Sequence, residues 1–432
     1  MLEVEGLDSE GRGVARRPDG KVVFVEGALP GERVAARLMT GGPRFDLARV
    51  VSIEEKSKGR REPRCPYFGV CGGCATQHAD LATQMAAKQE GLLQNLARIG
   101  KVHAERVLPW VAGEEWGYRH RARLSVRRVE KKGGVMVGFR ERRSTYVADM
   151  HECAVLPPRI SALIDPLREL IERLSVRSRL PQVEVAVADN AAALVMRHLL
   201  PLTDEDKQHL GTFAEHHGIH LWLQPGGPDT ARPFHPAASD LYYDLPEFQV
   251  RLHFRPTDFT QVNHAVNRTL VSRAVELLDP RPGERIADLF CGLGNFSLPI
   301  ARRGAQVIGF EGSAELVSRA RQNAAANGLV AQFEAMDLFA PNLRPYGPFD
   351  KLLIDPPRQG AIEIVKSIED LGSPSGPQRI VYVSCDPATL SRDAGVLVNA
   401  KNYRLVAAGV ANMFPHTAHV ESITLFEKGN PA

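Results

Sequence analysis

A cysteine followed directly by a helix-start signal stands in the last quarter of the chain. Cys385 follows the apolar run Ile380–Ser384 and precedes Asp386 and Pro387, residue types that favour an N-cap and a first helical turn. Because a helix N-terminus stabilises negative charge, we expect its dipole to favour the thiolate, with Asp386 partly opposing that shift. A small buried core thiol is the ordinary alternative. The place of Cys385 at the carboxyl end of a predicted parallel strand favours a nucleophile over that alternative.

Two carboxylates stand beside predicted strands in the same region. Asp355 follows the apolar run Lys351–Ile354 and precedes two prolines, which stiffen the turn and fix where the carboxylate points. Glu421 directly precedes the last predicted strand, Ser422–Phe426, and is a candidate general base. Its segment, 416–421, is equally typical of a polar loop. We therefore expect an acid and a thiol at one sheet edge.

A glycine-containing loop follows the first strand of this region. Asp288–Asn295 places glycines at 292 and 294, which allow a tight turn and a close approach to a ligand. Glu311 stands 23 residues after Asp288, where a carboxylate accepts hydrogen bonds from ribose hydroxyls. Asp337 ends the next strand, where it can accept from an adenine amino group. The third glycine of a pyrophosphate loop is missing, which favours S-adenosylmethionine over a dinucleotide; an ordinary capped turn is the alternative.

Four cysteines have the spacing of a ligand set rather than of disulfides. Three form a compact Cys-x5-Cys-x2-Cys loop and the fourth lies 79 positions further on, and they are Cys65, Cys71, Cys74 and Cys153. Four thiolates suit a [4Fe–4S] cluster or a structural zinc ion, and spacing alone does not separate the two. We interpret the site as structural, because four protein ligands leave no iron open for chemistry.

Basic residues are concentrated in one window of an otherwise nearly neutral chain. Residues 119–143 contain ten Lys and Arg against two Glu, whereas the net charge of the whole chain is +3. On alternating strands such a block predicts a positive face that attracts a nucleic acid, with a solvated sheet face as the alternative. Downstream, Phe259 stands near Gln261 and Asn263, a combination that can stack a base and hydrogen-bond its edge.

The elements that must position these residues fall into three parts. Short strands punctuated by Gly and Pro in 1–55 predict a small β-barrel, and 56–255 reads as a mixed α+β part. Residues 256–432 show a βαβα pattern, which predicts a doubly wound, Rossmann-like α/β domain that ends in an antiparallel edge hairpin. Its predicted strands are 286–289, 307–310, 332–335, 351–354, 380–384, 403–407 and 422–426.

Composition excludes several classes of protein. The 432 residues have ordinary apolar and charged fractions of 44% and 24%, which excludes a disordered or fibrous chain. No apolar run approaches the ~18 residues of a membrane span, and the N-terminus does not read as a secretory signal. Six cysteines are too few for a disulfide scaffold, so we expect a reducing cytoplasm. We also expect no membrane association and no obligate protein partner.

Together these motifs resemble the bacterial RNA uracil-C5 methyltransferases that use S-adenosylmethionine. The likeness covers essentially the whole chain and is strongest to the 23S ribosomal RNA type, which has an N-terminal TRAM domain and an iron–sulfur cluster. The segments Glu10–Ala15 and Phe24–Glu32 are similar to TRAM, an OB-like barrel. The resemblance implies methylation of a specific 23S uridine at C5. Related enzymes for transfer RNA, or for another ribosomal uridine, are the alternatives. The first lack the TRAM domain and the cluster and the second lack the TRAM domain, so the presence of both favours the 23S type named above.

The resemblance also assigns roles to residues. It implies a nucleophile at Cys385, a base at Glu421 and an aromatic at Phe259 that stacks on the substrate base. It implies iron rather than zinc at the four cysteines, and packing of 84–116 on the catalytic domain. The cofactor contacts that it implies are Gln261, Phe290, Asn295, Glu311, Asp337 and Asp355.

Two rival functions remain at this stage. Asp355-Pro356-Pro357 resembles the catalytic turn of amino-methyltransferases, but those place an aromatic after the prolines and this chain has Arg358. A non-catalytic RNA-binding assembly factor would use the barrel and the basic window without depending on Cys385. The chemistry favoured here is addition of the thiolate to uracil C6, which makes C5 nucleophilic, followed by loss of the C5 proton. The target base must leave its helix to reach such a pocket.

Overall fold

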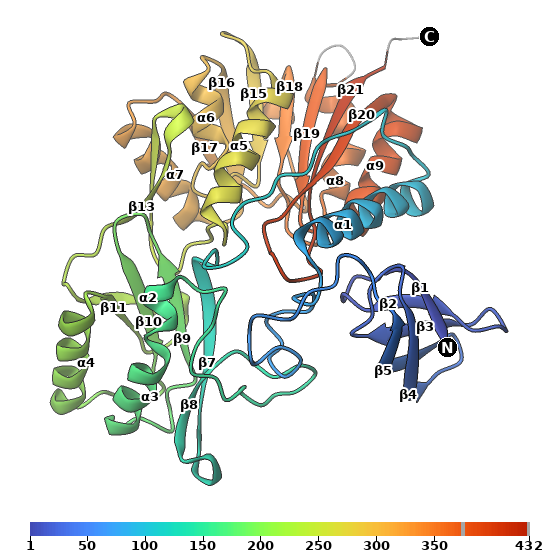
Figure 1. Ribbon diagram of the computed structural model, residues 1–432. Helices are drawn as coiled ribbons and strands as arrows, with labels where there is room; N and C mark the ends of the chain where they lie inside the picture. The colour runs from blue at the N-terminus through green and yellow to red at the C-terminus, as the bar shows by residue number, and fades with distance from the viewer. Residues whose placement is uncertain (373–375, 430–432) are drawn as a thin grey trace.

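The computed structural model describes residues 1–372 and 376–429, and its N-terminal part is a closed five-stranded barrel (Figure 1). The strands follow the order β1-β2-β3-β5-β4 around the barrel. Alternate residues such as Val23, Val25 and Val34 face the small core, as the period of a strand requires. The strands are β1 (Leu2–Leu7), β2 (Gly13–Arg16), β3 (Val22–Glu26), β4 (Arg33–Gly41) and β5 (Phe45–Glu55).

A long connection with turns and isolated bridges leads from the barrel to helix α1 (Leu81–Asn95). Asp80 caps this helix by accepting a hydrogen bond from the Thr83 N–H at 2.9 Å. A π-turn, η1 (Leu96–Gly100), ends it, and the short strand β6 (Arg106–Val107) pairs with the catalytic sheet. In Figure 1 this blue to cyan segment lies beside α9 (Pro387–Lys401) and β20 (Tyr403–Ala411), which come about 300 residues later in the sequence.

The central part is built on a six-stranded sheet in the order β12-β11-β10-β9-β7-β8. Three helices, α2 (Pro158–Ser161), α3 (Ile164–Arg173) and α4 (Asp204–His217), accompany the sheet, and a separate hairpin, β13–β14, follows it. The strands are β7 (Arg121–Val129), β8 (Gly134–Gly138), β9 (Gln182–Val187), β10 (Ala192–Arg197), β11 (His220–Gln224), β12 (Arg232–His235), β13 (Leu241–Leu245) and β14 (Val250–Phe254).

The C-terminal part carries an eight-stranded sheet in the order β17-β16-β15-β18-β19-β21-β20-β6. Neighbours from β17 to β19 pair in parallel, and β21 pairs antiparallel with both β19 and β20. The strands are β15 (Arg285–Leu289), β16 (Gln306–Glu311), β17 (Gln332–Ala335), β18 (Lys351–Ile354), β19 (Arg379–Ser384), β20 (Tyr403–Ala411) and β21 (Glu421–Lys428). The helices are α5 (His264–Leu278), α6 (Ser297–Arg302), α7 (Ala314–Ala326), α8 (Ile362–Lys366) and α9 (Pro387–Lys401).

Short 3₁₀ turns complete the described structure. They are η2 (Glu130–Lys132), η3 (Pro228–Thr230), η4 (Pro246–Phe248), η5 (Arg344–Tyr346) and η6 (Ile368–Leu371). Among the helices of the described residues, none combines the length and the apolar character that a membrane crossing requires.

Two apolar cores lie on opposite faces of the catalytic sheet. One contains residues of α5, α6 and α7 and also residues of the β13–β14 hairpin and the central sheet. The other contains residues of α8 and α9 together with Met85, Leu92 and Leu96 from the α1 segment. The first core therefore continues across the predicted boundary at residue 255. The boundaries at 55 and 255 stay predictions.

The fold prediction is confirmed for the barrel and for the doubly wound α/β part, with one difference at the sheet edge. The antiparallel pair β20–β21 is present, but it does not form the edge, because β6 pairs in parallel with β20 through Arg106 and Val107. A two-residue strand leaves no periodic signal in a sequence. The last three residues of the predicted catalytic domain lie outside the described residues.

Candidate active site and thiol pocket

Strand register brings the predicted nucleophile and the predicted base to facing positions. Ser384, the last residue of β19, pairs with Ser422 of the antiparallel strand β21. Cys385 directly follows β19 and Glu421 is the first residue of β21, so each stands one position beyond this last pair of the ladder, and the charge of Glu421 acts on the Cys385 thiol. Directly opposed residues of an antiparallel pair have Cβ atoms about 5 Å apart. The sequence separates these residues, and the ladder joins them.

Glu421 is buried and incompletely hydrogen-bonded. Only 2% of its surface is exposed, and its Oε1 atom has no hydrogen-bond partner. Burial raises the pKa of Glu421 well above its usual range, and the neighbouring Asp355 carboxylate raises it further. A carboxylate with a raised pKa is a stronger base than an exposed one, which suits removal of a proton from carbon.

Asp355 occupies the next position along the same edge. It follows Ile354, which pairs with Tyr382 of β19, and its N–H donates to the Leu289 carbonyl at 3.2 Å. Burial raises the pKa of Asp355 to about 7, and the negative charge of Asp288 adds to that shift. Asp355 and Glu421 therefore form a pair of acids that do not ionise independently.

The electrostatics of Cys385 differ from the expectation based on the helix dipole. Asp386 caps α9 by accepting from the Ala388 and Thr389 N–H groups, and Pro387 stands at the first helical position, as predicted. Nevertheless, burial raises the pKa of Cys385 to about 11, and the charges of Glu421 and Asp355 raise it, against a smaller effect of Arg358. Burial, together with the nearby carboxylates that the linear sequence does not place, outweighs the dipole.

The glycine loop adopts the strained turn that its composition predicts. Phe290, Gly292 and Gly294 all have positive φ, of 66°, 55° and 97°. A Cβ at Gly294 would lie 3.2 Å from the Leu298 side chain, so the turn also requires a small residue there. The Glu311 carboxylate accepts from the Gly292 N–H at 3.1 Å and from the Ser313 N–H at 3.0 Å. Glu311 thus ties the loop to the end of β16.

The other predicted cofactor residues differ in how far they are buried and in the contacts that hold them. Asn295 forms a reciprocal amide pair with Asn267 of α5, with two hydrogen bonds of 3.0 Å. Gln261 is partly buried, in the segment before α5. Asp337 is exposed and accepts from the Phe339 N–H at 2.9 Å. The Phe290 and Phe339 rings lie 5.9 Å apart.

Phe259, the predicted stacking residue, is 68% exposed on the loop before α5. An exposed aromatic of this size is unusual on a polar loop and is available for contact with a base. The preceding residue, Asp258, accepts from the Arg319 side chain at 3.2 Å and from the Arg255 N–H at 2.7 Å. The loop is therefore anchored immediately before the exposed ring.

Buried polar atoms without partners occur at predicted site residues and also at Thr260, Asn412 and Ser422, which the sequence analysis did not single out as site residues. Asp288 has a free Oδ1 atom, although its Oδ2 accepts from Ser297, and burial raises the pKa of Asp288 to about 7. Such atoms normally have partners, so their gathering near one sheet edge marks a polar ligand site. The only sequence feature that could have indicated Asn412 as a site residue is its amide side chain, just before the polar loop 416–421. Among the unpartnered buried atoms of the described residues, those that we assign to this site are Thr260 Oγ1, Asn263 Nδ2, Asp288 Oδ1, Asn412 Nδ2, Glu421 Oε1 and Ser422 Oγ.

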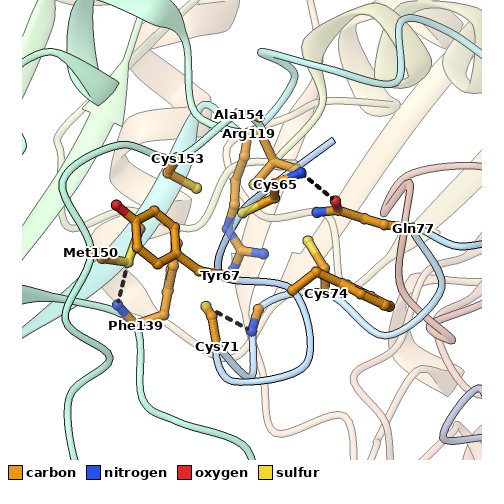
Figure 2. Close-up of a pocket in the computed structure, with 13 residues that line it drawn as sticks. Cys65, Tyr67, Cys71, Cys74, Gln77, Arg119, Phe139, Met150, Cys153 and Ala154 are labelled. Carbon is orange, nitrogen blue, oxygen red and sulfur yellow. Dashed lines mark hydrogen bonds between the residues drawn. The ribbon is translucent and has the colours of Figure 1, made fainter. Parts of the chain in front are cut away.

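The four clustered cysteines line one cavity. Figure 2 shows the sulfur atoms of Cys65, Cys71, Cys74 and Cys153 around a common space that Tyr67, Phe139 and Arg119 also line. Burial raises the pKa of Cys74 to about 12, and the neighbouring thiols raise it further. Within the described ranges, no group of three or more His, Cys, Asp or Glu side chains forms a site that would hold a metal ion as the side chains stand.

The basic window divides into structural and exposed residues. Arg121 is largely enclosed and donates to the Pro256 carbonyl, whereas Arg128 pairs with Glu172 and Glu130. Arg143 pairs at 2.7 Å with Glu26 of the barrel. The prediction of one positive face is therefore too broad, because tertiary contacts use part of the charge. The cations that are exposed are Arg123, Arg127, Lys131, Lys132, Arg140 and Arg143.

A glycine loop, an acid after the second strand and a thiol that faces a carboxylate define an α/β enzyme of the methyltransferase type. Comparison with known families agrees. The tRNA (uracil-5-)-methyltransferase family matches residues 81–338 and 338–429, and the TRAM domain matches residues 2–55. The chain therefore belongs to the RNA uracil-C5-methyltransferase family and carries a TRAM domain, as the resemblance implied.

Curated relatives cover the chain from end to end. A protein of Thiobacillus denitrificans is 60% identical over 99% of both chains, and one of Nitrosospira multiformis is 59% identical over 98% of both. Both are named 23S rRNA (uracil(1939)-C(5))-methyltransferase RlmD. Among solved structures, the Pyrococcus abyssi tRNA (uracil-54, C5)-methyltransferase in complex with S-adenosyl-L-homocysteine has a TM-score of 0.75. It covers 99% of both chains at 24% identity, which supports the common fold.

Proposed function

We propose that this enzyme transfers a methyl group from S-adenosylmethionine to C5 of a single uridine in 23S ribosomal RNA, the position numbered 1939 in the names of its relatives. The full-length identity to those relatives supports the substrate. The facing of Cys385 and Glu421 across β19 and β21 carries the chemical proposal. Uracil C5 is a poor nucleophile, and this pair supplies what the ring needs, a reversible thiol adduct and a base.

The mechanism uses the chain's own groups in sequence. The Cys385 thiolate forms a bond to C6 of the flipped uracil, and the electron pair of the C5–C6 double bond moves onto C5 and O4. S-adenosylmethionine, when bound, supplies the methyl group that C5 takes from the sulfonium. The Glu421 carboxylate then removes the C5 proton, the double bond forms again, and the C6–S bond breaks to return the thiolate. The raised pKa of Cys385 keeps the free enzyme mostly as the thiol, so the S–H proton passes to solvent before the C6–S bond forms and returns to the sulfur after that bond breaks.

The residues present fit the methyl donor. Glu311 stands at the end of β16, where an acid accepts from ribose hydroxyls, and the Gly292–Gly294 turn allows close approach. The free Oδ1 of Asp288 adds an acceptor beneath the loop. We assign contacts to the donor to Gln261, Phe290, Asn295, Glu311, Asp337 and Asp355, with Asp355 also within the region that the uracil would occupy.

We infer further that the four cysteines hold a [4Fe–4S] cluster. Their shared cavity and mutual influence on pKa support a common ligand that carries positive charge. Four thiols on one cavity suit either a zinc ion or an iron–sulfur cluster. The similarity of the four cysteines to the ligand set of the ribosomal RNA uracil-C5 methyltransferases favours iron. When bound, the cluster would act as a staple between the 65–74 loop and Cys153.

The reaction and its compartment are mutually consistent. All six cysteines are free thiols in the structure. Free thiols and a ribosomal RNA substrate both favour a reducing cytoplasm. Exposed cations of the 119–143 window and the barrel are the surfaces that we assign to RNA contact.

Trapping with 5-fluorouracil-substituted RNA tests this function. Fluorine at C5 cannot leave as a cation, so an adduct that has received its methyl group cannot resolve. We expect the wild-type protein to form a covalent RNA complex that survives a denaturing gel and contains labelled methyl. Cys385→Ala should bind the same RNA and form no complex. An amino-methyltransferase or an assembly factor would give no adduct with either protein.

The choice of RNA separates the substrate from its alternatives. The test offers a 23S fragment that contains the target uridine, the same fragment with that uridine replaced by cytidine, and transfer RNA. We expect methyl incorporation into the first alone. Incorporation into transfer RNA instead would leave the C5 chemistry standing and overturn the ribosomal substrate.

A further inference from the structure

The loop that leads into Glu421 is held by segments from three distant parts of the chain. Residues 412–420 join β20 to β21, and Glu421 pairs with Ala411 where the two strands meet the loop. The Asn412 N–H donates to the Val111 carbonyl at 2.7 Å. From α1, the Lys88 ammonium donates to Asn412 Oδ1 at 2.8 Å and to the Phe414 carbonyl at 3.0 Å. Contacts of this kind fix the backbone on which the carboxylate stands.

His416 is the most tightly held residue of this loop. Its φ of +62° is in the left-handed region, which a non-glycine residue occupies only when its surroundings hold it there. Its N–H donates to Gln84 Oε1 at 2.8 Å, and its carbonyl accepts from the N–H groups of Ala75 and Thr76 at 2.7 and 3.0 Å. Three partners from outside the loop therefore define one backbone conformation.

The His416 imidazole is packed rather than poised for chemistry. The ring is 2% exposed and stacks on Trp116, with centroids 4.0 Å apart. The Arg64 guanidinium lies 5.1 Å from the centroid of the same Trp116 ring. Tyr118 adds a hydrogen bond of 3.0 Å from its hydroxyl to the Pro415 carbonyl. The ring and its neighbours thus support the loop mechanically.

The partners of His416 connect the loop to the thiol pocket and to the barrel. Ala75 and Thr76 directly follow Cys74, so their N–H groups are placed by the same loop that carries three of the clustered thiols. On the barrel side, a Cβ at Gly11 would lie 2.8 Å from Thr76 Cγ2 and 3.7 Å from Ala418 Cβ. The barrel, the thiol loop and the loop before Glu421 therefore meet at one point.

We propose that Gln84, together with the 75–76 segment and Tyr118, positions Glu421 for removal of the C5 proton by clamping the loop at His416. The proposal rests on the proposed role of Glu421 as base. It predicts a specific defect, because loosening the clamp moves the carboxylate while leaving the Cys385 thiol, between β19 and α9, in place. Formation of the adduct and methyl transfer then continue, and resolution of the methylated adduct slows.

The test uses single-turnover reactions of the full-length protein with the 23S RNA fragment and methyl-labelled donor. Gln84→Met keeps the length of the side chain and removes the acceptor for the His416 N–H. Gln94→Met is the matched control, because Gln94 lies on the same helix, is exposed and bonds only to Glu90. Tyr118→Phe removes a single hydroxyl and is the second variant, should Gln84→Met fail to fold. Glu421→Gln is the reference for a blocked base.

We expect Gln84→Met to accumulate a labelled RNA–protein adduct and to resolve it about 10- to 100-fold more slowly than wild type, as a displaced catalytic group would. Tyr118→Phe should slow resolution about threefold, and Gln94→Met should match wild type. Affinity for RNA should stay within about twofold throughout. If Glu421→Gln accumulates adduct while both clamp variants resolve it at the wild-type rate, the clamp is refuted and the base role stands. If Glu421→Gln accumulates none, the base role fails and the positioning proposal fails with it.

Discussion

The sheet edge and the thiol pocket both gather acidic groups in enclosed surroundings, but the chain builds them in different ways. At the edge, Asp355, Cys385 and Glu421 each adjoin a strand, and the backbone ladder sets their spacing. In the pocket, three thiols lie on a connection of turns and isolated bridges, and Cys153 comes from the segment between β8 and α2. A site built on a ladder keeps its shape without a ligand, whereas a site built on turns depends on what it binds.

The two regions also differ in how their charge is balanced. Burial raises the pKa of the acids at the sheet edge, to about 7 for Asp355, and the charges of neighbouring acids raise it further. The rigid strands hold these like charges together, and a cationic sulfonium would relieve the repulsion. In the pocket, the high pKa of Cys74 has the same origin, burial among like groups, but no ladder holds the thiols. The comparison predicts that ligand loss damages the fold only in the pocket.

The largest effect is expected from Cys385→Ala. Removing the sulfur abolishes the adduct, so methyl transfer should fall by at least about a thousandfold, as for loss of other covalent nucleophiles. Because Cys385 is outside the apolar core, the unfolding midpoint should stay close to that of wild type. Filter-binding and methyl-incorporation assays on one preparation measure both. Retained turnover in the purified variant would remove the thiol from the mechanism.

The next effect tests the dependence of the pocket on its ligand. If the pocket holds the proposed cluster, Cys153→Ser should lose most of the bound iron and lower the free energy of unfolding by about 3 kcal/mol, because the link between two distant segments is lost. Cys291→Ala, at a buried thiol outside the pocket, is the control and should keep its iron. Iron analysis and urea denaturation provide the readouts. Full iron content in Cys153→Ser would show that the pocket binds differently.

Asp355→Asn tests the strain at the sheet edge. The folded pKa of Asp355, about 7, lies above its ordinary value of 3.8, so the neutral form contributes stability at low pH that is lost as pH rises through about 7. Asparagine does not ionise. Without bound S-adenosylmethionine, the free energy of unfolding of the variant minus that of wild type should therefore be about 1–2 kcal/mol larger at pH 8 than at pH 5. Asp337→Asn, at an exposed acid that follows β17 of the same sheet, is the control substitution. A difference that is equal at both pH values contradicts the shift.

The smallest effect concerns RNA contact by the basic window. Neutralising Arg123 and Arg127, which are exposed on one face of β7, should reduce the slope of log affinity against log salt by about 1–2. Arg121→Gln should instead lower stability and leave the slope unchanged, since Arg121 donates to the Pro256 carbonyl. Binding titrations at several salt concentrations distinguish the two. An unchanged slope in the double variant would direct the RNA path away from this face.

Much of the fold follows from local patterns. The predicted strands 332–335 and 351–354 coincide with β17 and β18, and the cap at Asp386 and the turn at Gly292–Gly294 form as composition requires. Strand β6 was missed because two residues have no periodicity. The clamp on His416 was also missed, since its partners Gln84, Ala75 and Thr76 are more than 300 positions away.

The sequence by itself determined the chemical types of the site residues and the order of the predicted strands along the chain. It also determined the end of each strand at which an acid or a thiol stands. These features depend on neighbours in the chain. Tertiary structure alone decided the direction of the Cys385 pKa, the division of the basic window and the support of the loop before Glu421. Each of these depends on charges and hydrogen bonds between segments that meet only after folding, and such interactions leave no periodic trace in the chain.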